Sequence, residues 1–374
     1  MKKIKSLSEG QFLKLFFTFF SAAFLLAAFF MPDRGTMLSG LWQILSQPSK
    51  LTCSYFAIGG YAATFLNMGL VGILSLLLFV VFKGTPNNAS TLAFILTLGF
   101  GSWGINILNI WPTVFGVMLY GLVKKEKFGT LVNAMLFSTG IAPLITDLMI
   151  RYPHAEVVGF NLPGIGLSLL VGAVIGFFLP AGLANSPKVH KGFDLYSAAL
   201  PIGMTAFFLN ATLFKTLGVD LPAGAEAAQL QVASQATVNV FCLILFGACV
   251  AFAFALGCRP KDYWQLLKDP ALVTNFSSTY GNATFLMNVA SSACSFWATT
   301  MPSALPSTAS PSASSSVCSP PAIPAPIPAM SGPLCWATWW LPLSAAGCLS
   351  WPAAPSPWPS MPRPSAWACA TPTA

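Results

Sequence analysis

Charged side chains are scarce in this chain. Asp, Glu, Lys and Arg make up 7% of the 374 residues, and there are two histidines. This scarcity excludes an ordinary soluble domain, in which about a quarter of the residues are charged. Instead, 55% of the residues are apolar and the mean hydropathy is +0.71, which predicts an all-α, polytopic membrane protein in contact with a lipid bilayer. The net charge of +8 does not indicate nucleic-acid binding, because the lysines stand singly or in small groups beside apolar runs.

The sequence also lacks the residue patterns of common catalytic and metal sites. Its nine cysteines include no Cys-x-x-Cys pair and no zinc spacing, so neither a metal site nor a disulfide framework is predicted. A Ser-His-Asp order, a His-Glu-x-x-His motif and paired carboxylates within a span are missing too. No nucleotide-binding domain is recognisable. We therefore predict no enzyme activity, no cofactor and no ATP-driven transport.

Long apolar runs divide the chain into spans. A basic start precedes the run 11–31. A signal peptide is the alternative for this run, but no small-x-small cleavage site follows it, so an uncleaved first span within residues 1–36 is predicted. Residues 37–50 favour an interfacial helix. Further spans are predicted at 55–82, 128–150, 162–184, 195–214 and 232–257.

The functional hypothesis depends on residues 90–123. This stretch has no charge and runs for 34 residues, whereas one span needs about 20. Its middle contains residues that interrupt helices: Gly99, Gly101, Gly104, Asn106, Asn109 and Pro112. In lipid, freed backbone groups are tolerated where they are buried in protein or line a cavity. We predict a re-entrant or broken helical hairpin, a feature of many transporter binding sites. A long kinked helix is the alternative.

The lysines and arginines favour the hairpin, because these residues concentrate in short cytoplasmic loops. If residues 90–123 enter and leave on one side, thirteen of the Lys and Arg residues before position 290 are cytoplasmic and four are not. If the stretch crosses the membrane once, seven of these residues are cytoplasmic and ten are not. The hairpin topology predicts a multi-pass protein of the cell membrane with its N-terminus in the cytoplasm.

A sequence echo predicts a partial inverted repeat. LSQPSKLT followed by GGYAATFLNMG recurs as LKDPALVT followed by YGNATFLMNV, so that Gly60 pairs with Gly281 and Asn67 with Asn288. Five crossings separate the copies in the hairpin topology, so they begin on opposite sides of the membrane. We assign residues 37–258 to a membrane domain with the first repeat, and 259–289 to the start of the second.

The composition changes abruptly at residue 290. From there to the end, the chain contains one charge, Arg363, and is rich in Pro, Ser and Ala, yet it holds seven of the eleven tryptophans. Such Pro/Ser/Ala tracts predict a disordered tail for residues 290–374. Read one base late, leucine codons CTG yield Trp or Cys and glycine codons GGC yield Ala. A frameshift therefore explains the mixture, and a native low-complexity tail is the alternative.

Two stretches resemble a known family. IGGYAATFLNMGL and GTPNNASTLAFILTLGFGSWGINILNIWPTVFGVMLYG are similar to the pattern of bacterial multi-pass membrane proteins catalogued as domain of unknown function fifteen seventy-six. The turn KGTPNNAST departs from the family's Asn-Gly-Pro-Thr character. The resemblance covers residues 40–289 approximately and implies a polytopic fold in a bacterial inner membrane, but no activity. The positions it carries over are Gly59, Gly60, Asn67, Gly69, Gly104, Asn106, Asn109 and Pro112.

Polar residues near apolar segments are the candidate functional groups. A buried amide bonds a neighbouring helix, the commoner case, or faces a cavity, as we expect of Asn106 and Asn109. Asp147 and Asp194 are candidates for ion coupling, but their places near predicted span ends favour a solvated interfacial carboxylate. The candidates for substrate binding are Asn67, Gly99, Gly101, Gly104, Asn106 and Asn109. The three glycines also spell G-x-G-x-x-G, but their apolar flanks favour packing or an unwound apex over a dinucleotide site.

These features predict a secondary-transporter-like permease for a small polar solute, with or without ion coupling. The alternative is a non-transporting scaffold or sensor subunit, or a lipid-modifying membrane enzyme. A polar cavity reached alternately from each side would indicate transport, and a dry bundle would indicate a scaffold. The change of composition at residue 290 predicts further that this copy is truncated and inactive.

Overall fold

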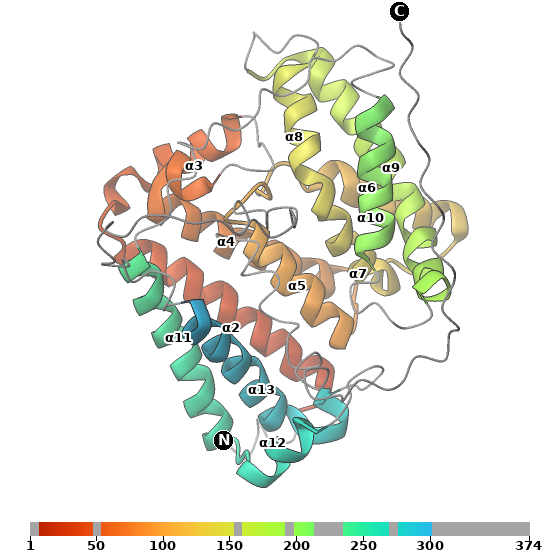
Figure 1. Ribbon diagram of the computed structural model, residues 1–374. Coiled ribbons are helices and arrows are strands. Elements are labelled where there is room, and N and C mark those ends of the chain that lie inside the picture. The colour runs from red at the N-terminus through yellow and green to blue at the C-terminus, as the bar shows by residue number, and fades with distance from the viewer. Residues whose placement is uncertain are drawn as a thin grey trace, which may run out of the picture.

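The computed structural model describes residues 7–47, 54–152, 159–190, 198–212, 235–268 and 276–300 (Figure 1). Within these ranges it is helical and has no strand, which confirms the all-α class. The tail beyond residue 300 and the candidate Asp194 lie outside the described residues. The helices are α2 (Glu9–Phe30), η1 (Arg34–Thr36), α3 (Met37–Ser46), α4 (Tyr55–Val81), α5 (Asn88–Phe100), α6 (Trp111–Lys124), α7 (Phe128–Ser138), η2 (Thr139–Ile141), α8 (Ala142–Arg151), α9 (Leu162–His190), α10 (Ala199–Ala211), α11 (Gln235–Ala255), α12 (Pro260–Leu266) and α13 (Phe276–Thr300).

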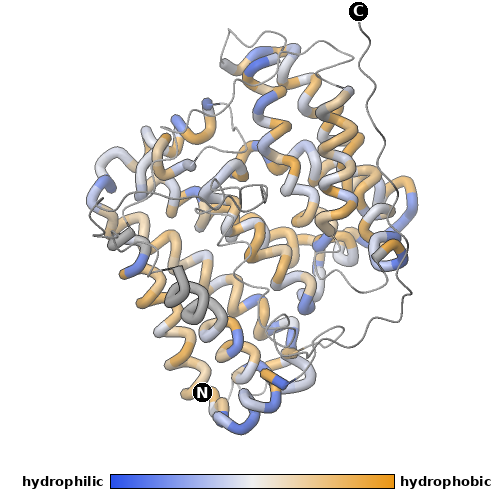
Figure 2. The backbone as a smooth tube through the Cα atoms, viewed as in Figure 1, coloured by the Kyte–Doolittle hydropathy of each residue, from blue (hydrophilic) through white to orange (hydrophobic). Residues whose placement is uncertain are grey.

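Four helical segments of the described chain are long and apolar enough to cross a membrane. They are Glu9–Phe30, Tyr55–Val81, Phe128–Arg151 and Leu162–Val189. A fifth candidate is the pair Asn239–Ala255 and Pro260–Leu266, which is bent by 114°. Apolar residues run along nearly the whole length of these helices (Figure 2), as expected where both the core and the lipid contact apolar side chains. The chain is thus a multi-pass membrane protein.

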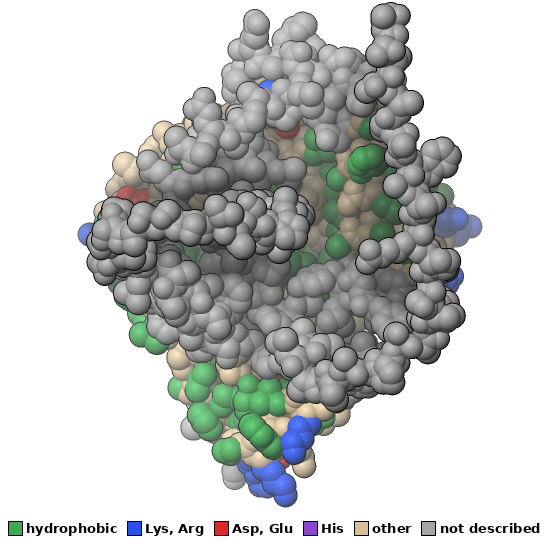
Figure 3. Space-filling model, in the orientation of Figure 1, with side chains coloured by type: hydrophobic (Ala, Val, Ile, Leu, Met, Phe, Trp, Pro, Cys, Tyr) green, Lys and Arg blue, Asp and Glu red, His purple; other side chains and the backbone are tan. Residues whose placement is uncertain are grey.

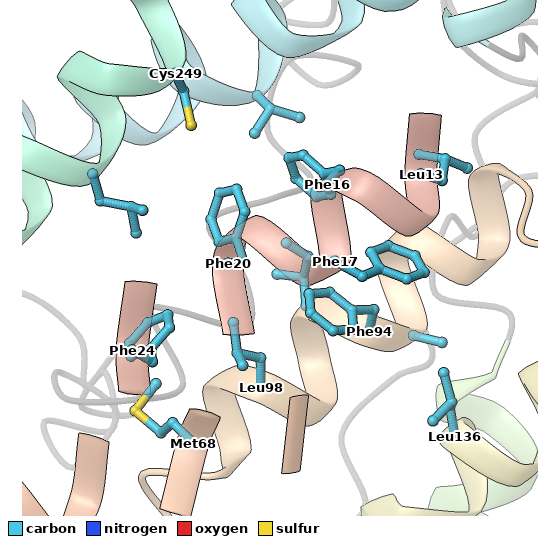
Figure 4. Close-up of a cluster of buried hydrophobic side chains, with 14 of the residues drawn as sticks. Leu13, Phe16, Phe17, Phe20, Phe24, Met68, Phe94, Leu98, Leu136 and Cys249 are labelled. Atoms are coloured by element: carbon cyan, nitrogen blue, oxygen red, sulfur yellow. The ribbon is translucent and has the colours of Figure 1, made fainter. Parts of the chain in front are cut away.

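Helix α2 packs in the middle of the largest core. Leu13, Phe17 and Phe24 on this helix have no solvent exposure, and the ring of Phe17 stacks on that of Phe94 with centroids 4.2 Å apart (Figure 4). The first span is therefore part of the folded bundle. On the face shown in Figure 3, apolar side chains form patches on the described surface and Lys and Arg lie at its edges, as suits a lipid-facing protein.

The predicted hairpin is present as two helices with a break between them. α5 ends at Phe100 and α6 begins at Trp111. Both ends of the hairpin lie together: the rings of Phe82, before α5, and Phe128, after α6, are 5.2 Å apart. A Cβ on Gly129 would lie 2.6 Å from the carbonyl oxygen of Phe82. The stretch therefore enters and leaves at one end of the molecule, which rules out the single kinked helix.

The sequence echo corresponds to two three-helix units, α2–α3–α4 and α11–α12–α13. Each unit has a long apolar helix, a short helix, and a second long helix that bends at a glycine. The bends are at Gly60 (φ 82°, ψ −177°) and Gly281 (φ 84°, ψ 160°), each five residues after its helix begins. Only glycine adopts this backbone conformation readily. The pairing of Gly60 with Gly281 predicted from sequence is thus matched by their geometry.

The two units run in opposite directions. The start of α2 lies beside the start of α13, where Asn282 Nδ2 donates to the Leu7 carbonyl at 3.4 Å, and Phe12 packs on Phe285 further along. The later part of α2 meets the beginning of α11, with the rings of Phe24 and Phe241 4.9 Å apart. Helix α2 is therefore parallel to α13 and antiparallel to α11. Because α2 and α11 occupy equivalent places in their units, the repeat is inverted (Figure 1).

Candidate functional site

Asn67 on α4 holds the hairpin break in place. Its Nδ2 donates to the carbonyl oxygens of Gly101 at 2.6 Å and Ile105 at 2.9 Å, and its side chain is fully buried. These two carbonyls belong to the ten residues between α5 and α6 that form no regular helix. In an apolar interior, carbonyls freed in this way need donors. Asn67 supplies them from the neighbouring span.

Asn106 and Asn109 satisfy the break from within. The Asn106 N–H donates to Asn109 Oδ1 at 2.9 Å, and the Asn109 N–H donates to Asn106 Oδ1 at 3.0 Å. Asn109 Nδ2 donates to the Gly104 carbonyl and to Thr146 Oγ1, both at 2.7 Å. Both side chains are 1% exposed. These amides face protein, and they bond backbone groups that a continuous helix would have satisfied itself.

The three glycines of the G-x-G-x-x-G pattern serve close packing. Gly99 belongs to α5, so the pattern follows a helix and not the strand that a dinucleotide site requires. Gly101 lies against α4, where a Cβ would be 3.2 Å from the Met68 Cα. Gly104 has φ +97° and faces Pro143 of α8. Packing at an unwound apex, the favoured interpretation of this motif, agrees with the geometry.

A second interruption lies against the hairpin break. The span Phe128–Arg151 changes from α7 to the 3-10 turn η2 and then to α8. Thr139 of η2 has its Oγ1 3.4 Å from that of Thr97 on α5, and Thr146 of α8 accepts from Asn109. Two mid-span irregularities therefore meet inside the bundle. Such places, where helices are discontinuous, are where transporters bind their substrates.

A cavity of about 350 Å³ lies beside these interruptions. Its walls come from α5, the break, α7, η2 and α10. Two of its lining side chains, Thr97 and Thr139, carry a hydrogen-bonding group. The lining residues are Leu92, Ala93, Leu96, Thr97, Phe100, Ile105, Leu136, Phe137, Thr139, Gly140, Ala198, Ala199, Ile202 and Gly203. Of the predicted substrate-binding residues none is among them, although Ile105 and Phe100 are their neighbours in the chain.

Asp147 is buried, contrary to the expectation of a solvated carboxylate. Its Oδ1 lies 3.2 Å from Arg151 Nη1, one helical turn away, and the side chains of Arg151 and Asp147 are 8% and 9% exposed. The last turn of α8 packs into the protein, so the carboxylate is withdrawn from water and paired with a guanidinium. A buried charge requires such a partner. The sequence predicts the span end correctly, but not its burial.

Sequence reasoning missed the role of Asp33. Its carboxylate accepts from the N–H groups of Tyr61 at 2.7 Å and Ala62 at 3.1 Å, immediately after the bend at Gly60. It therefore caps the helix that restarts inside α4. The MPDRG motif after the first span shows an acid, but its partners lie far along the chain, in the next span. Only the packing of α2 and η1 on α4 reveals the pair.

A family model described as "Protein of unknown function (DUF1576)" matches residues 34–215. This part of the chain belongs to that family. The DUF1576 region contains α3 to α10, and with them Asn67, the hairpin break, the cavity and the Asp147–Arg151 pair. It ends before the second three-helix unit, short of the 289 predicted from resemblance. Neither the curated proteins nor the solved structures include a match to this chain.

Proposed function

We propose that this protein is built as a secondary-transporter-like permease for a small solute, and neither as an enzyme nor as a scaffold or sensor subunit, and that this copy is truncated and inactive. The observation that carries the proposal is the meeting of two mid-span breaks beside a cavity. Irregular backbone within a membrane is costly unless it is buried or lines a cavity. Here three buried asparagines form hydrogen bonds with the irregular backbone. A bundle that served only as a scaffold would not need such irregular backbone.

The inverted repeat supports the same function. In many transporters, one inverted repeat moves against the other, and this movement opens a central site to each side of the membrane in turn. The units α2–α3–α4 and α11–α12–α13 have this relation, and each contains a glycine bend. Asn67 ties the first unit to the hairpin break at the edge of the cavity. A movement of that unit would therefore be transmitted to the cavity wall.

The roles of Asp147 and Asp194 in ion coupling stay predictions. Asp147 and Arg151 neutralise each other at the end of α8, and neither lines the cavity. The simplest form of the proposal is therefore a uniporter, whose cycle needs no coupled ion. Flux measured with and without a sodium or proton gradient separates the two forms.

The orientation we propose puts the N-terminus and both ends of the hairpin in the cytoplasm of a bacterial cell. Lys83 and residues 124–127 lie at the same end, as the contact of Phe82 with Phe128 requires. Single cysteines at Lys83 and Lys125, labelled in intact cells with an impermeant thiol reagent, should both remain unlabelled until the cells are opened. Labelling of the two positions from opposite faces would contradict the topology.

The accessibility of a thiol introduced at the cavity can test transport without knowledge of the solute. In a cysteine-free background, Gly203→Cys places a thiol at the cavity, where a Cβ meets nothing within 4 Å. Gly166→Cys on α9 has equal free space outside the cavity and is the matched control. In a protein whose reading frame past codon 290 has been restored, an impermeant reagent should reach Gly203→Cys in both right-side-out and inverted vesicles, and Gly166→Cys from one side only. One-sided labelling at Gly203→Cys would favour the scaffold.

A further inference from the structure

The described lining of the cavity offers nothing that could stabilise a charge. Its described lining residues are apolar except for Thr97 and Thr139, and none is ionisable. A charged group moved into such surroundings needs a partner of opposite charge or several oriented dipoles. The described lining therefore favours a neutral solute.

Most polar groups near the cavity are already used by the protein, with Asn67 Oδ1 and Thr91 Oγ1 as exceptions that have no partner among the described residues. Asn67 Nδ2 donates to two carbonyls of the break, and Asn109 Nδ2 donates to a third carbonyl and to Thr146. Asp147 is paired with Arg151. These groups would have to leave buried partners to bind a polar solute, at a cost comparable to the bond gained. The described polar groups therefore disfavour a multiply polar solute, such as a sugar.

Among the described lining residues, the two threonines define the polar contact that remains. Thr97 Oγ1 donates to the Ala93 carbonyl at 2.8 Å, and Thr139 Oγ1 donates to the Leu136 carbonyl at 2.7 Å. Their oxygens are 3.4 Å apart. Each hydroxyl has one hydrogen and two acceptor lone pairs, so with both hydrogens directed to helix carbonyls, acceptor capacity is left. The complementary solute carries a single N–H or O–H donor.

Size narrows the class further. A dry apolar cavity of about 150 Å³ binds benzene, so one of about 350 Å³ has room for roughly two fused rings. Resting on the permease function proposed above, we propose that the transported solute is a neutral, mainly apolar molecule of about this size with one hydrogen-bond donor. Indole has this chemistry and serves as the probe.

Binding of indole to the purified full-length protein in nanodiscs tests the substrate class. Equilibrium dialysis with labelled indole, corrected with empty nanodiscs for partition into lipid, should show saturable binding. 1-Methylindole, which lacks the N–H donor, should displace labelled indole about two- to tenfold more weakly than unlabelled indole does. Indole itself should bind the Thr97→Val variant about two- to tenfold more weakly than it binds the parent protein. Indole-3-acetate, which carries a carboxylate, should not compete.

Filling the cavity should abolish binding. Gly140→Leu introduces a side chain towards Ile202, and Gly203→Leu introduces one into open space, so a folding defect in the first leaves the second usable. Gly166→Leu, outside the cavity, should bind as the parent protein does. The substrate class would be overturned by any of three results: no saturable binding, competition by indole-3-acetate, or full binding by both filled variants. Indole binding with one-sided labelling of Gly203→Cys would instead overturn the permease and leave the ligand class standing.

Discussion

Replacement of Asn67 by alanine should destabilise the fold measurably. Two buried bonds at the average found for membrane proteins, about 0.6 kcal/mol each, set a lower bound of about 1 kcal/mol. Two buried carbonyls without donors, at about 1–3 kcal/mol each, set an upper bound of about 6 kcal/mol. Asn67 Oδ1 accepts no hydrogen bond from the described part of the chain, so its removal recovers some of this cost. We expect a loss of about 2–4 kcal/mol, between these bounds.

The free energy of unfolding, measured by titration with SDS in mixed micelles, provides the assay. Asn67→Asp should be at least as damaging, because it keeps the shape but directs oxygens at the Gly101 and Ile105 carbonyls. Asn185→Ala is the control, since that exposed amide bonds residues of its own helix: it donates to the Ala181 carbonyl at 2.8 Å and accepts from Lys188 Nζ at 3.0 Å. A loss in Asn67→Ala no larger than that in Asn185→Ala, and within the roughly 0.5 kcal/mol typical of surface substitutions, would refute the view that Asn67 holds the break.

Three further results are expected. Asp33→Ala should lower the free energy of unfolding by about 0.5–2 kcal/mol, the usual range for a lost helix cap, and Asp33→Asn should recover part of it. Gly60→Ala and Gly281→Ala should each cost about 1–3 kcal/mol by backbone strain. Gly60→Ala should cost more, because its Cβ would overlap Asp33 Oδ2 whereas nothing lies within 4 Å at Gly281. The gene, translated in its other frames past codon 290, should encode an apolar run and a Gly/Asn-broken stretch; frames full of stop codons would contradict the frameshift.

Much of the architecture can be predicted from the sequence, because hydrophobicity determines where a chain crosses a membrane. The sequence predicts the second span at 55–82, and the structure has Tyr55–Val81. It also predicts the break within the Gly- and Asn-rich middle of 90–123, and helix α5 ends at Phe100 there. Both signals are local: a run of apolar residues, and residues that cannot continue it. The repeated motif also pairs Gly60 with Gly281, whereas the bend at each of them is a finding of the structure.

The site can be predicted only in part, since long-range partners are not written in local patterns. Asn67, Asn106 and Asn109 are recognisable as buried polar residues, but whether an amide faces a solute or a carbonyl depends on which backbone lies opposite. Asp147 is correctly placed near a span end, yet the packing of α8 decides that it is buried. The cavity escapes prediction because apolar residues such as Ile202 resemble any other core residue in sequence.

The broken helices also explain why conspicuous polar residues do not mark the cavity. Each break in the described part of the first unit and its hairpin requires donors or acceptors, and the chain supplies them from side chains: Asp33 after Gly60, and the asparagines between α5 and α6. In lipid no water is available to do this. The polar residues most visible in an apolar sequence are therefore those that keep irregular backbone stable. Beside these residues, an apolar cavity and the hydroxyl oxygens of Thr97 and Thr139 are left to recognise a solute. The lining of the cavity, and not the Gly- and Asn-rich motif, is therefore the argument for a neutral solute.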